Sequence, residues 1–404
     1  MLNCAGMYNG AQNIKIMIDQ KIPLLEKPYF NEILQSIDKN EFIIPKEYNS
    51  EYFPEFIAKQ LEKYVKYYEE NCSFIFKSVP HLTEPHNWAN MLESIKNLAQ
   101  AIKESVDLYF NGDIFRATQV FNNSLNSILF REFSPIYDVV KNTVFYRSRR
   151  DEKRSFDRGD MFHVKFEERN KISTNRYSIP GFPALYLGET TYVCWEESDR
   201  YRLRDLWFSR IENKEVLKVI KIQRFEDLLG EIEKMDNGDH DKLSHLCKYL
   251  IIYPLTIACT VKVKDQKNNF TPQYIIPQLL LQYIATFKDA GERIDGIMYL
   301  SSQVDYSKIK GVKCYNYVFP VKTSIKNGFC DQLSKTFHIS EPTSLEIEEI
   351  IHNPKYPEAF MQEGNSTDSI ELSNGIKSIY ANMSFGRLEQ SLAMKPVTVV
   401  VEID

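Results

Sequence analysis

The chain has 404 residues, enough for two or three domains, and its composition of 43% hydrophobic and 26% charged residues is that of an ordinary globular protein. A net charge of −5 and an isoelectric point near 5.9 exclude a whole-chain attraction to nucleic acid or to an anionic membrane. The sequence has no long apolar run, no signal-like start and no C-x-x-C pair among its seven cysteines, which predicts a cytoplasmic protein with reduced thiols.

The first third of the chain has the periodicity of amphipathic helices. Apolar side chains recur every three or four residues within 53–71 and again within 87–112, where Gly112 stands at a position that commonly ends a helix. We therefore predict a helical N-terminal domain over residues 1–140.

From residue 141 the pattern changes to short β-rich runs. They are TVFYRS, PALYLG, EVLKVIKI, TIACTVKV, GIMYLSS and CYNYVFPV, at residues 143–148, 183–188, 215–222, 256–263, 296–302 and 314–321. A helix is expected over 274–289, where Pro277 falls in the first turn. Together these elements predict an α+β domain over residues 141–320.

The remaining residues, 321–404, are more polar and form a C-terminal extension. Residues 352–369 are rich in Pro, Gly, Asn and Ser and predict a loop, a helix is expected over 376–394, and a last strand over 396–403. The pattern leaves open whether this extension packs on the core or on a partner.

Common catalytic motifs are absent, since the chain has no phosphate-binding G-x-x-x-x-G-K-[ST], no G-x-G-x-x-G and no H-E-x-x-H. A cluster at 238–247 holds Asp239, His240, Asp241, His245 and Cys247. The two histidines are five residues apart and fall on different faces of a helix, which favours a solvated helix start over a metal site.

Two stretches are candidates for a binding site. Residues 147–176 hold ten Lys and Arg against six Asp and Glu, which indicates either a solvated loop or an anion site built from Arg147, Arg149 and Arg176. Residues 176–197 start at Arg176, pass through Tyr186 in a strand and end at Glu197 in a helix, so the three side chains can face one pocket; a core tyrosine and a solvated glutamate are the alternative.

The second stretch resembles the RES domain, a family of toxin–antitoxin proteins named for Arg, Glu and Ser residues. Members carry an Arg, a Tyr ten residues later in an L-Y-L strand and a Glu eleven residues further on, as Arg176, Tyr186 and Glu197 do here. The serine lies in a later G-I-x-Y-x-S strand, which matches residues 296–301 and Ser301, and an opening Y-R-x-R matches residues 146–149. The resemblance covers about 141–320.

Two departures from the family pattern affect the assignment. The 104 residues from Glu197 to Ser301 exceed the spacing of compact members, which predicts insertions between them. Glu196 adjoins Glu197, so a shift of one position would make Glu196 the acidic residue.

The resemblance implies a mixed or antiparallel β core like that of ADP-ribosyltransferases, and an activity that degrades NAD. Glu197 would stabilise the cationic ribose, Arg176 and Arg147 would hold the pyrophosphate, Tyr186 would stack on nicotinamide or ribose, and Ser301 would orient the leaving ring. NAD is then a substrate, and neither a cofactor nor a metal is expected.

The resemblance implies phosphate as the acceptor, and the protein would then be a NAD phosphorylase. With water as the acceptor it would be a NAD hydrolase, and with a protein side chain it would be a mono-ADP-ribosyltransferase. The resemblance also leaves open an Xre-type antitoxin partner, a homo-oligomer and a role in phage defence. The competing hypothesis is a module without activity that senses NAD or ADP-ribose, or that binds RNA through residues 147–176, although the overall charge does not favour nucleic acid.

Overall fold

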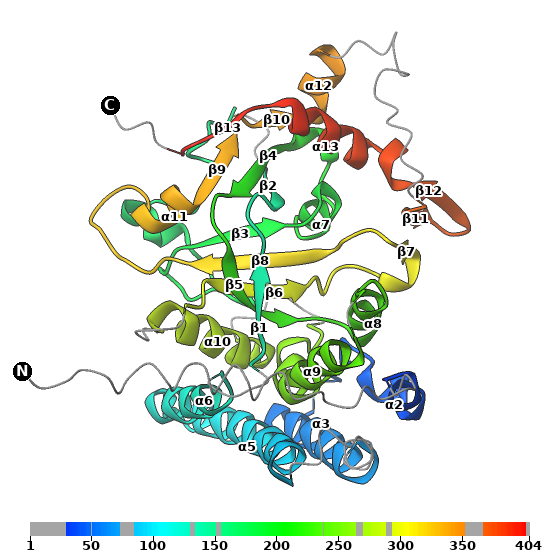
Figure 1. The fold of residues 1–404 in the computed structure, drawn as a ribbon. Coiled ribbons are helices and arrows are strands. Elements are labelled where there is room, and N and C mark those ends of the chain that lie inside the picture. The colour runs from blue at the N-terminus through cyan, green and yellow to red at the C-terminus, as the bar shows by residue number, and fades with distance from the viewer. Residues whose placement is uncertain are drawn as a thin grey trace, which may run out of the picture.

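The computed structural model describes residues 30–49, 51–72, 85–129, 134–150, 155–236, 238–263, 270–287, 293–351 and 367–400. Within these residues a layer of helices lies beneath a large mixed sheet, and the C-terminal part of the chain lies at the end of the molecule away from that layer (Figure 1). The fold is α+β, as the sequence predicted. No helix of the described residues is both long enough and apolar enough to cross a membrane.

The helices are unevenly spread along the chain. They are α2 (Phe30–Ser36), α3 (Phe53–Tyr67), α5 (Pro85–Phe110), α6 (Ile114–Leu129), α7 (Thr191–Glu196), α8 (Phe225–Glu233), α9 (Asp239–Cys259), α10 (Ile275–Thr286), α11 (Asp331–Thr336), α12 (Leu345–Ile351) and α13 (Ser384–Met394). The predicted C-terminal end of the long N-terminal helix is confirmed, because α5 ends at Phe110, two residues before Gly112, which has a φ of 81° that favours glycine.

The strands form one large sheet and one small one. They are β1 (Ile136–Val139), β2 (Val144–Arg150), β3 (Ala184–Gly188), β4 (Leu206–Asn213), β5 (Leu217–Ile222), β6 (Gly296–Leu300), β7 (Ile309–Lys310), β8 (Tyr315–Pro320), β9 (Phe337–Ser340), β10 (Thr343–Ser344), β11 (Ser369–Ser373), β12 (Ile376–Ile379) and β13 (Val397–Thr398). The large sheet runs β1-β5-β6-β8-β3-β2-β4-β9-β13 with β10 beside β4, and the small sheet runs β12-β11-β7. Within the large sheet β5 and β6 are parallel and the other paired strands are antiparallel.

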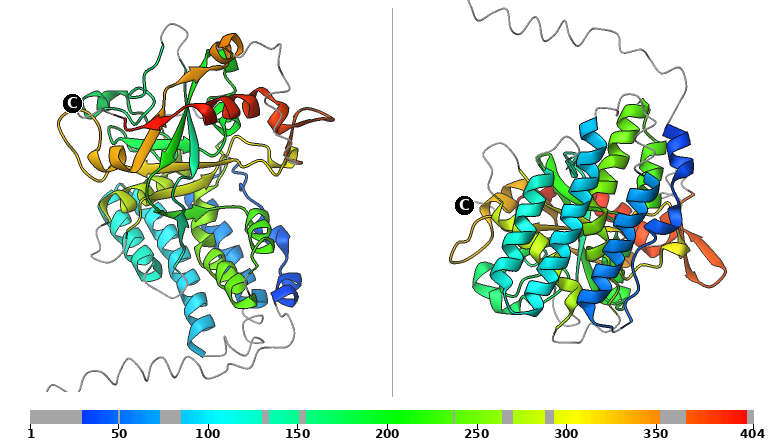
Figure 2. Two further views of the ribbon diagram at one scale, coloured as in Figure 1. Left: turned by 45° about the horizontal axis from the view of Figure 1, so that its top comes forward. Right: turned by 90° about the horizontal axis from the view of Figure 1, so that it is seen from below.

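The helical layer is built from two distant parts of the chain. Helices α3, α5 and α6 come from the N-terminal third, and α9 and α10 come from the segment between Glu197 and Ser301 (Figure 2). Helix α5 packs against all four of the others, and side chains such as Ile95 and Ile102 are fully buried there. The long spacing that departs from the RES pattern therefore supplies helices that dock on the N-terminal ones.

The large sheet is weakly paired at one position, between β2 and β3. Strands β2 and β4 pair along seven residues, whereas β2 and β3 share only the pair Tyr146 and Gly188. Beyond that pair the two strands separate, so their facing backbone groups need other partners. The candidate site lies at this position.

Two sequence predictions were wrong in detail. Of the run TIACTVKV at 256–263, residues 256–259 are the end of α9 and residues 260–263 form no strand. The last nine residues of α9, 251–259, are all buried, because this part of the helix lies between the sheet and helices α3 and α5, and it is therefore apolar on every face. Residues 376–379 form β12 rather than the start of a helix, because the turn at Gly375 (φ 80°) closes a hairpin with β11. The expected helix begins only at α13.

The C-terminal extension is integrated into the sheet region. Strands β9, β10 and β13 extend the large sheet, and α13 packs against α7. Of the expected last strand, residues 396–400 are described, and within them Val397–Thr398 is a strand. The loop expected at 352–369 lies largely outside the described residues. The proposed limits of the three domains, 1–140, 141–320 and 321–404, stay a prediction.

Candidate active site

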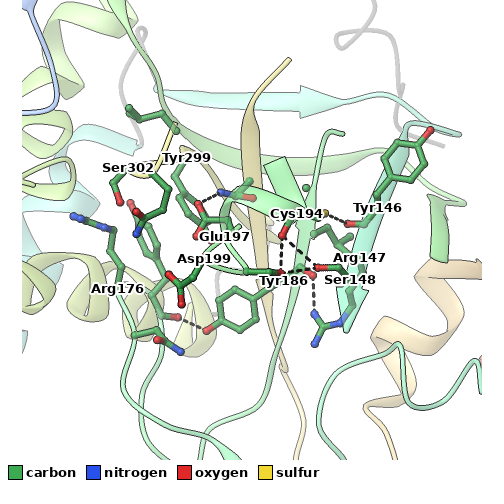
Figure 3. A pocket seen from close by; sticks show the side chains of 18 of the residues that line it. Tyr146, Arg147, Ser148, Arg176, Tyr186, Cys194, Glu197, Asp199, Tyr299 and Ser302 are labelled. Atoms are coloured by element: carbon green, nitrogen blue, oxygen red, sulfur yellow. Dashed lines mark hydrogen bonds between the residues drawn. The ribbon is translucent and has the colours of Figure 1, made fainter. Parts of the chain in front are cut away.

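A cavity of about 440 Å³ opens where β2 and β3 separate (Figure 3). Its walls come from the two strands, the loop before β3, the end of α7 and the residues at the end of β6. The lining residues are Tyr146, Arg147, Ser148, Arg149, Asn175, Arg176, Tyr177, Tyr186, Leu187, Gly188, Cys194, Glu197, Ser198, Asp199, Tyr274, Tyr299, Leu300, Ser302, Gln303 and Asn316. The volume lies within the usual range of small-molecule sites, about 300–1,000 Å³.

Helix α7 brings Glu197 to this cavity. Thr190 caps the helix by accepting the N–H of Val193 at 3.2 Å. Gly188 allows the helix to lie directly on β3, because a Cβ at that position would be 2.6 Å from Val193 Cγ1. Glu197 follows the last residue of α7, and its side chain lines the cavity (Figure 3).

The Glu197 carboxylate is held by the protein and remains open to the cavity. Asn316 Nδ2 donates to Glu197 Oε1 at 2.8 Å, while Glu197 as a whole remains exposed to solvent. The protein around the carboxylate displaces water and raises its pKa, whereas hydrogen bonds from Ser301 and Asn316 and the charge of Arg176 oppose that rise. A fixed carboxylate in this setting can stabilise a positive charge that develops on a bound molecule.

The neighbouring Glu196 is directed elsewhere. Its side chain is 1% exposed, and its two carboxylate oxygens accept from Arg200 Nε at 2.8 Å and Nη2 at 3.1 Å. Glu196 does not line the cavity. Of the two adjacent glutamates, the geometry therefore brings Glu197 into the candidate site.

Arg176 reaches the cavity from the loop before β3. Its Nη1 and Nη2 donate to the carbonyls of Cys259 and Val261, both at 2.9 Å, and its guanidinium lies 5.5 Å from the ring centre of Tyr274. Cys259 is the last residue of α9 and Val261 follows just beyond it, so the guanidinium lies at the C-terminal end of the helix, where a cation is favoured by the helix dipole. The helical layer thus fixes the position of an arginine that lines the cavity beside Glu197.

Arg147 is a buried part of the cavity wall. It is 8% exposed, and its Nη1 donates to the Tyr186 carbonyl at 2.6 Å across the gap between β2 and β3. The guanidinium thereby bridges strands that lack ladder hydrogen bonds at this point. Burial and the charge of Arg149 hold the pKa of Arg147 well below its usual range.

Other arginines of the basic stretch bind the backbone. Arg149 donates to the carbonyls of Asp160 and Phe162 at 3.2 and 3.3 Å, and Arg169 donates to the Gly181 carbonyl at 2.9 Å. These bonds hold the segment between β2 and β3 against the body of the protein. In the described part of 147–176, the guanidiniums of Arg149 and Arg169 therefore bind the protein's own backbone and do not converge on one anion site.

Tyr186 forms a wall of the cavity. Its hydroxyl donates to the Tyr177 carbonyl at 2.7 Å, and burial raises its pKa to about 12, so the phenol is neutral at physiological pH. In the view of Figure 3, Tyr186 lies between Arg176 on one side and Arg147 on the other. Its ring is the surface that a bound planar group would meet.

Ser301 lies behind the wall rather than on it. It is 1% exposed, and its Oγ accepts the Gln303 N–H at 3.2 Å. Its hydroxyl also forms a hydrogen bond with the Glu197 carboxylate, which lowers the pKa of that group. Ser302 and Gln303 line the cavity in its place. The structure therefore brings Arg176, Tyr186 and Glu197 to the cavity, with Arg147 buried in its wall and Ser301 supporting Glu197.

Asn316 and Asp199 are among the polar residues of the site that sequence reasoning missed. Asn316 is buried in the otherwise apolar β8, and a polar residue within such a run was the signal that could have identified it. Asp199 faces the cavity with a φ of 55°, a left-handed conformation that Asp adopts more readily than most residues (Figure 3). The sequence gives no signal that places its carboxylate there.

The acidic and histidine cluster at 238–247 starts a helix, as predicted. Helix α9 begins at Asp239, whose side chain, with that of His240, lies outside the described residues. His245 Nδ1 contacts the Asp241 carbonyl at 3.0 Å, and Cys247 is buried in the core. Among the described residues no group of three or more His, Cys, Asp or Glu side chains has the arrangement of a metal site.

The chain was compared with protein families, curated proteins and solved structures. No protein-family model matches it, and no solved structure matches it. A curated protein of Bacillus subtilis (strain 168), named "Putative toxin YopC", is 32% identical over 326 residues, which cover 75% of this chain and 70% of that protein. Identity of this extent shows common descent along most of both chains, and the protein described here therefore belongs to the same family as YopC.

Proposed function

We propose that this protein is a RES-type toxin that degrades NAD by cleaving the bond between nicotinamide and ribose, with phosphate as the acceptor. The toxin relative supports the biological role. The observation that carries the chemistry is that Arg176, Tyr186 and Glu197, which match the spacing of the RES domain, line a single cavity (Figure 3).

The reaction needs what Glu197 offers. As the glycosidic bond breaks, its electron pair leaves with nicotinamide, and positive charge develops on the ribose as an oxocarbenium-like ion. Nicotinamide departs as a neutral molecule, so the reaction depends little on a general acid. The carboxylate stabilises the cation, and a phosphate oxygen then forms the new bond to the ribose carbon, which yields ADP-ribose phosphate.

The arginines divide the binding of the substrate. Arg176 keeps N–H groups beyond the two that bind the carbonyls of Cys259 and Val261, and these can meet a pyrophosphate oxygen by charge-assisted hydrogen bonds. Arg147 is buried and contributes its charge through the wall rather than by open contact. Tyr186 supplies a flat apolar surface for nicotinamide or ribose.

The decisive experiment measures nicotinamide release from NAD by the purified full-length chain, with and without phosphate. Phosphate-dependent release is the expected result. Release that ignores phosphate would make the protein a NAD hydrolase, and modification of an added protein would make it a transferase. Absence of nicotinamide release under all conditions contradicts the proposal.

Three variants make the assay specific. Glu197→Gln and Arg176→Ala should abolish or strongly reduce release, whereas Glu196→Gln changes the adjacent carboxylate and should leave it active. Each variant is checked for folding by circular dichroism. Equal loss of activity in both glutamate variants would argue against the assignment of Glu197.

A further inference from the structure

The C-terminal extension contacts the helix that carries Glu197. Helix α13 packs against α7, and the Phe385 ring lies 5.4 Å from Tyr192 and 5.3 Å from Trp195, measured between ring centres. These residues are nearly two hundred positions apart in the sequence. The extension therefore forms part of the immediate surroundings of α7 and does not lie apart from the site region (Figure 1).

One carboxylate of α13 makes polar contacts at the start of α7. Glu389 Oε1 accepts the Thr191 backbone N–H at 2.7 Å, the Thr191 hydroxyl at 3.0 Å and the Tyr380 hydroxyl at 2.5 Å. The first N–H groups of a helix have no partner within the helix. Glu389 satisfies one of these groups, while Thr190 satisfies another by capping Val193.

Helix α7 depends on such contacts because it is short. It spans six residues, less than two turns, and a helix of this length has no stability of its own in water. Its orientation is set by its caps, by Gly188 beneath it and by α13 beside it. Because α7 is held at its start and Glu197 directly follows its last residue, we expect a change at the start of α7 to move Glu197 as well.

We propose that Glu389 is a positioning residue for Glu197, so that the C-terminal extension completes the active site from outside the region that resembles the RES domain. Glu389 holds the first residue of α7 and does not line the cavity. Its carboxylate fixes the helix, and the helix fixes the reacting carboxylate. This inference rests on the proposed NAD-cleaving function.

A matched carboxylate in the same extension provides the control. Glu348 of α12 is also buried and also bonded to hydroxyl groups, those of Thr343 and Ser391, with Lys395 Nζ at 3.2 Å. These partners all lie outside α7. Glu348→Gln should disturb the extension without disturbing the helix that carries Glu197.

The test compares Glu389→Ala, Glu389→Gln and Glu348→Gln in the full-length chain. We expect Glu389→Ala to lower kcat for nicotinamide release by about 10- to 100-fold with KM for NAD changed less than about twofold, since a misplacement near 1 Å has an effect of this size. Glu389→Gln keeps an acceptor oxygen for the Thr191 N–H and should recover part of kcat. Glu348→Gln should keep the kcat of the wild type although it loses about as much thermal stability as Glu389→Ala.

A second measurement does not depend on activity. Hydrogen exchange at the amides of Thr191 to Glu197 should be faster in Glu389→Ala and unchanged in Glu348→Gln. If the wild-type chain releases no nicotinamide but this exchange difference appears, the proposed function is wrong and Glu389 still holds α7. If the wild type is active and Glu389→Ala keeps both its kcat and its exchange rates, or if Glu348→Gln loses kcat equally, the positioning role is wrong.

Discussion

The helical layer and the cavity wall differ in what they bury. In the helical layer, α5 places fully buried apolar side chains such as Ile95 and Ile102 against α3, α6 and α9. The cavity wall instead surrounds charged groups, and the folded protein raises the pKa of Glu197 and lowers that of Arg147. Both shifts mean that the fold disfavours the charged forms, so the cavity carries groups that cost stability while the helical layer provides it.

Glu197→Gln gives the largest expected effect on activity. The neutral amide cannot stabilise the developing ribose cation, so we expect kcat for nicotinamide release to fall by about 10²- to 10³-fold. The same change should leave the thermal midpoint at pH 7 equal or higher. A raised folded-state pKa means that the wild type loses stability as pH rises from the ordinary carboxyl value near 4.5 through the folded-state value, and the amide is spared this loss.

The same shift predicts a pH dependence of the wild-type reaction. Only the ionised Glu197 can stabilise the cation, so activity should fall on acidification at a pH above the usual range of a glutamate. The measurement is kcat/KM for NAD between pH 4 and 8, on protein shown to be folded throughout. An acid limb at or below pH 4.5, or loss of the acid limb in Glu196→Gln, would disagree with this assignment.

Ile102→Ala tests the other region. Ile102 is fully buried in α5, and truncation of such a side chain in a packed core costs about 2–5 kcal/mol of the free energy of unfolding. We expect urea unfolding to report that loss, while kcat per folded molecule stays within about twofold of the wild type. A large fall in kcat at a temperature where the variant is folded would show that the helical layer controls the site, and that the two regions do not divide stability and activity.

Arg147→Met separates packing from charge in the cavity wall. Methionine fills much of the same volume, and the lowered pKa of Arg147 shows that its charge costs stability below that pKa. The charge-assisted bond to the Tyr186 carbonyl is lost, so the two effects oppose each other. We therefore expect the free energy of unfolding, measured in urea, to change by less than about 1 kcal/mol. NAD turnover should fall by about tenfold, and unchanged turnover would make Arg147 purely structural.

Some features of this fold were readable from the sequence because they depend on local pattern. The amphipathic stripes predicted α3 and α5, and the alternating runs predicted β2, β3, β5, β6 and β8. The run 256–263 was misread because the last nine residues of α9, 251–259, are buried on all sides, which removes the helical period from the apolar residues there. Only the tertiary arrangement decides that case.

The sequence predicted those residues of the candidate site that lie close together along the chain. The intervals between Arg176, Tyr186 and Glu197 placed all three on one cavity, because a turn, a strand and a helix follow one another directly there. Asn316 and Glu389 could not be found in this way, since they reach α7 from strands and helices far along the chain. The position of Ser301 behind Glu197 likewise depends on how β6 lies in the sheet.

Glu196→Gln should have the smallest effect and completes the contrast at the level of two neighbouring residues. Glu196 has a buried carboxylate, but its partner Arg200 has a side chain that is 52% exposed and can return to water when the charge is removed. We expect a loss of about 1 kcal/mol in the free energy of unfolding and nicotinamide release within about twofold of the wild type. Glu196 does not line the cavity. A fall in nicotinamide release comparable to that of Glu197→Gln would therefore mean that a charge outside the cavity also affects the reaction.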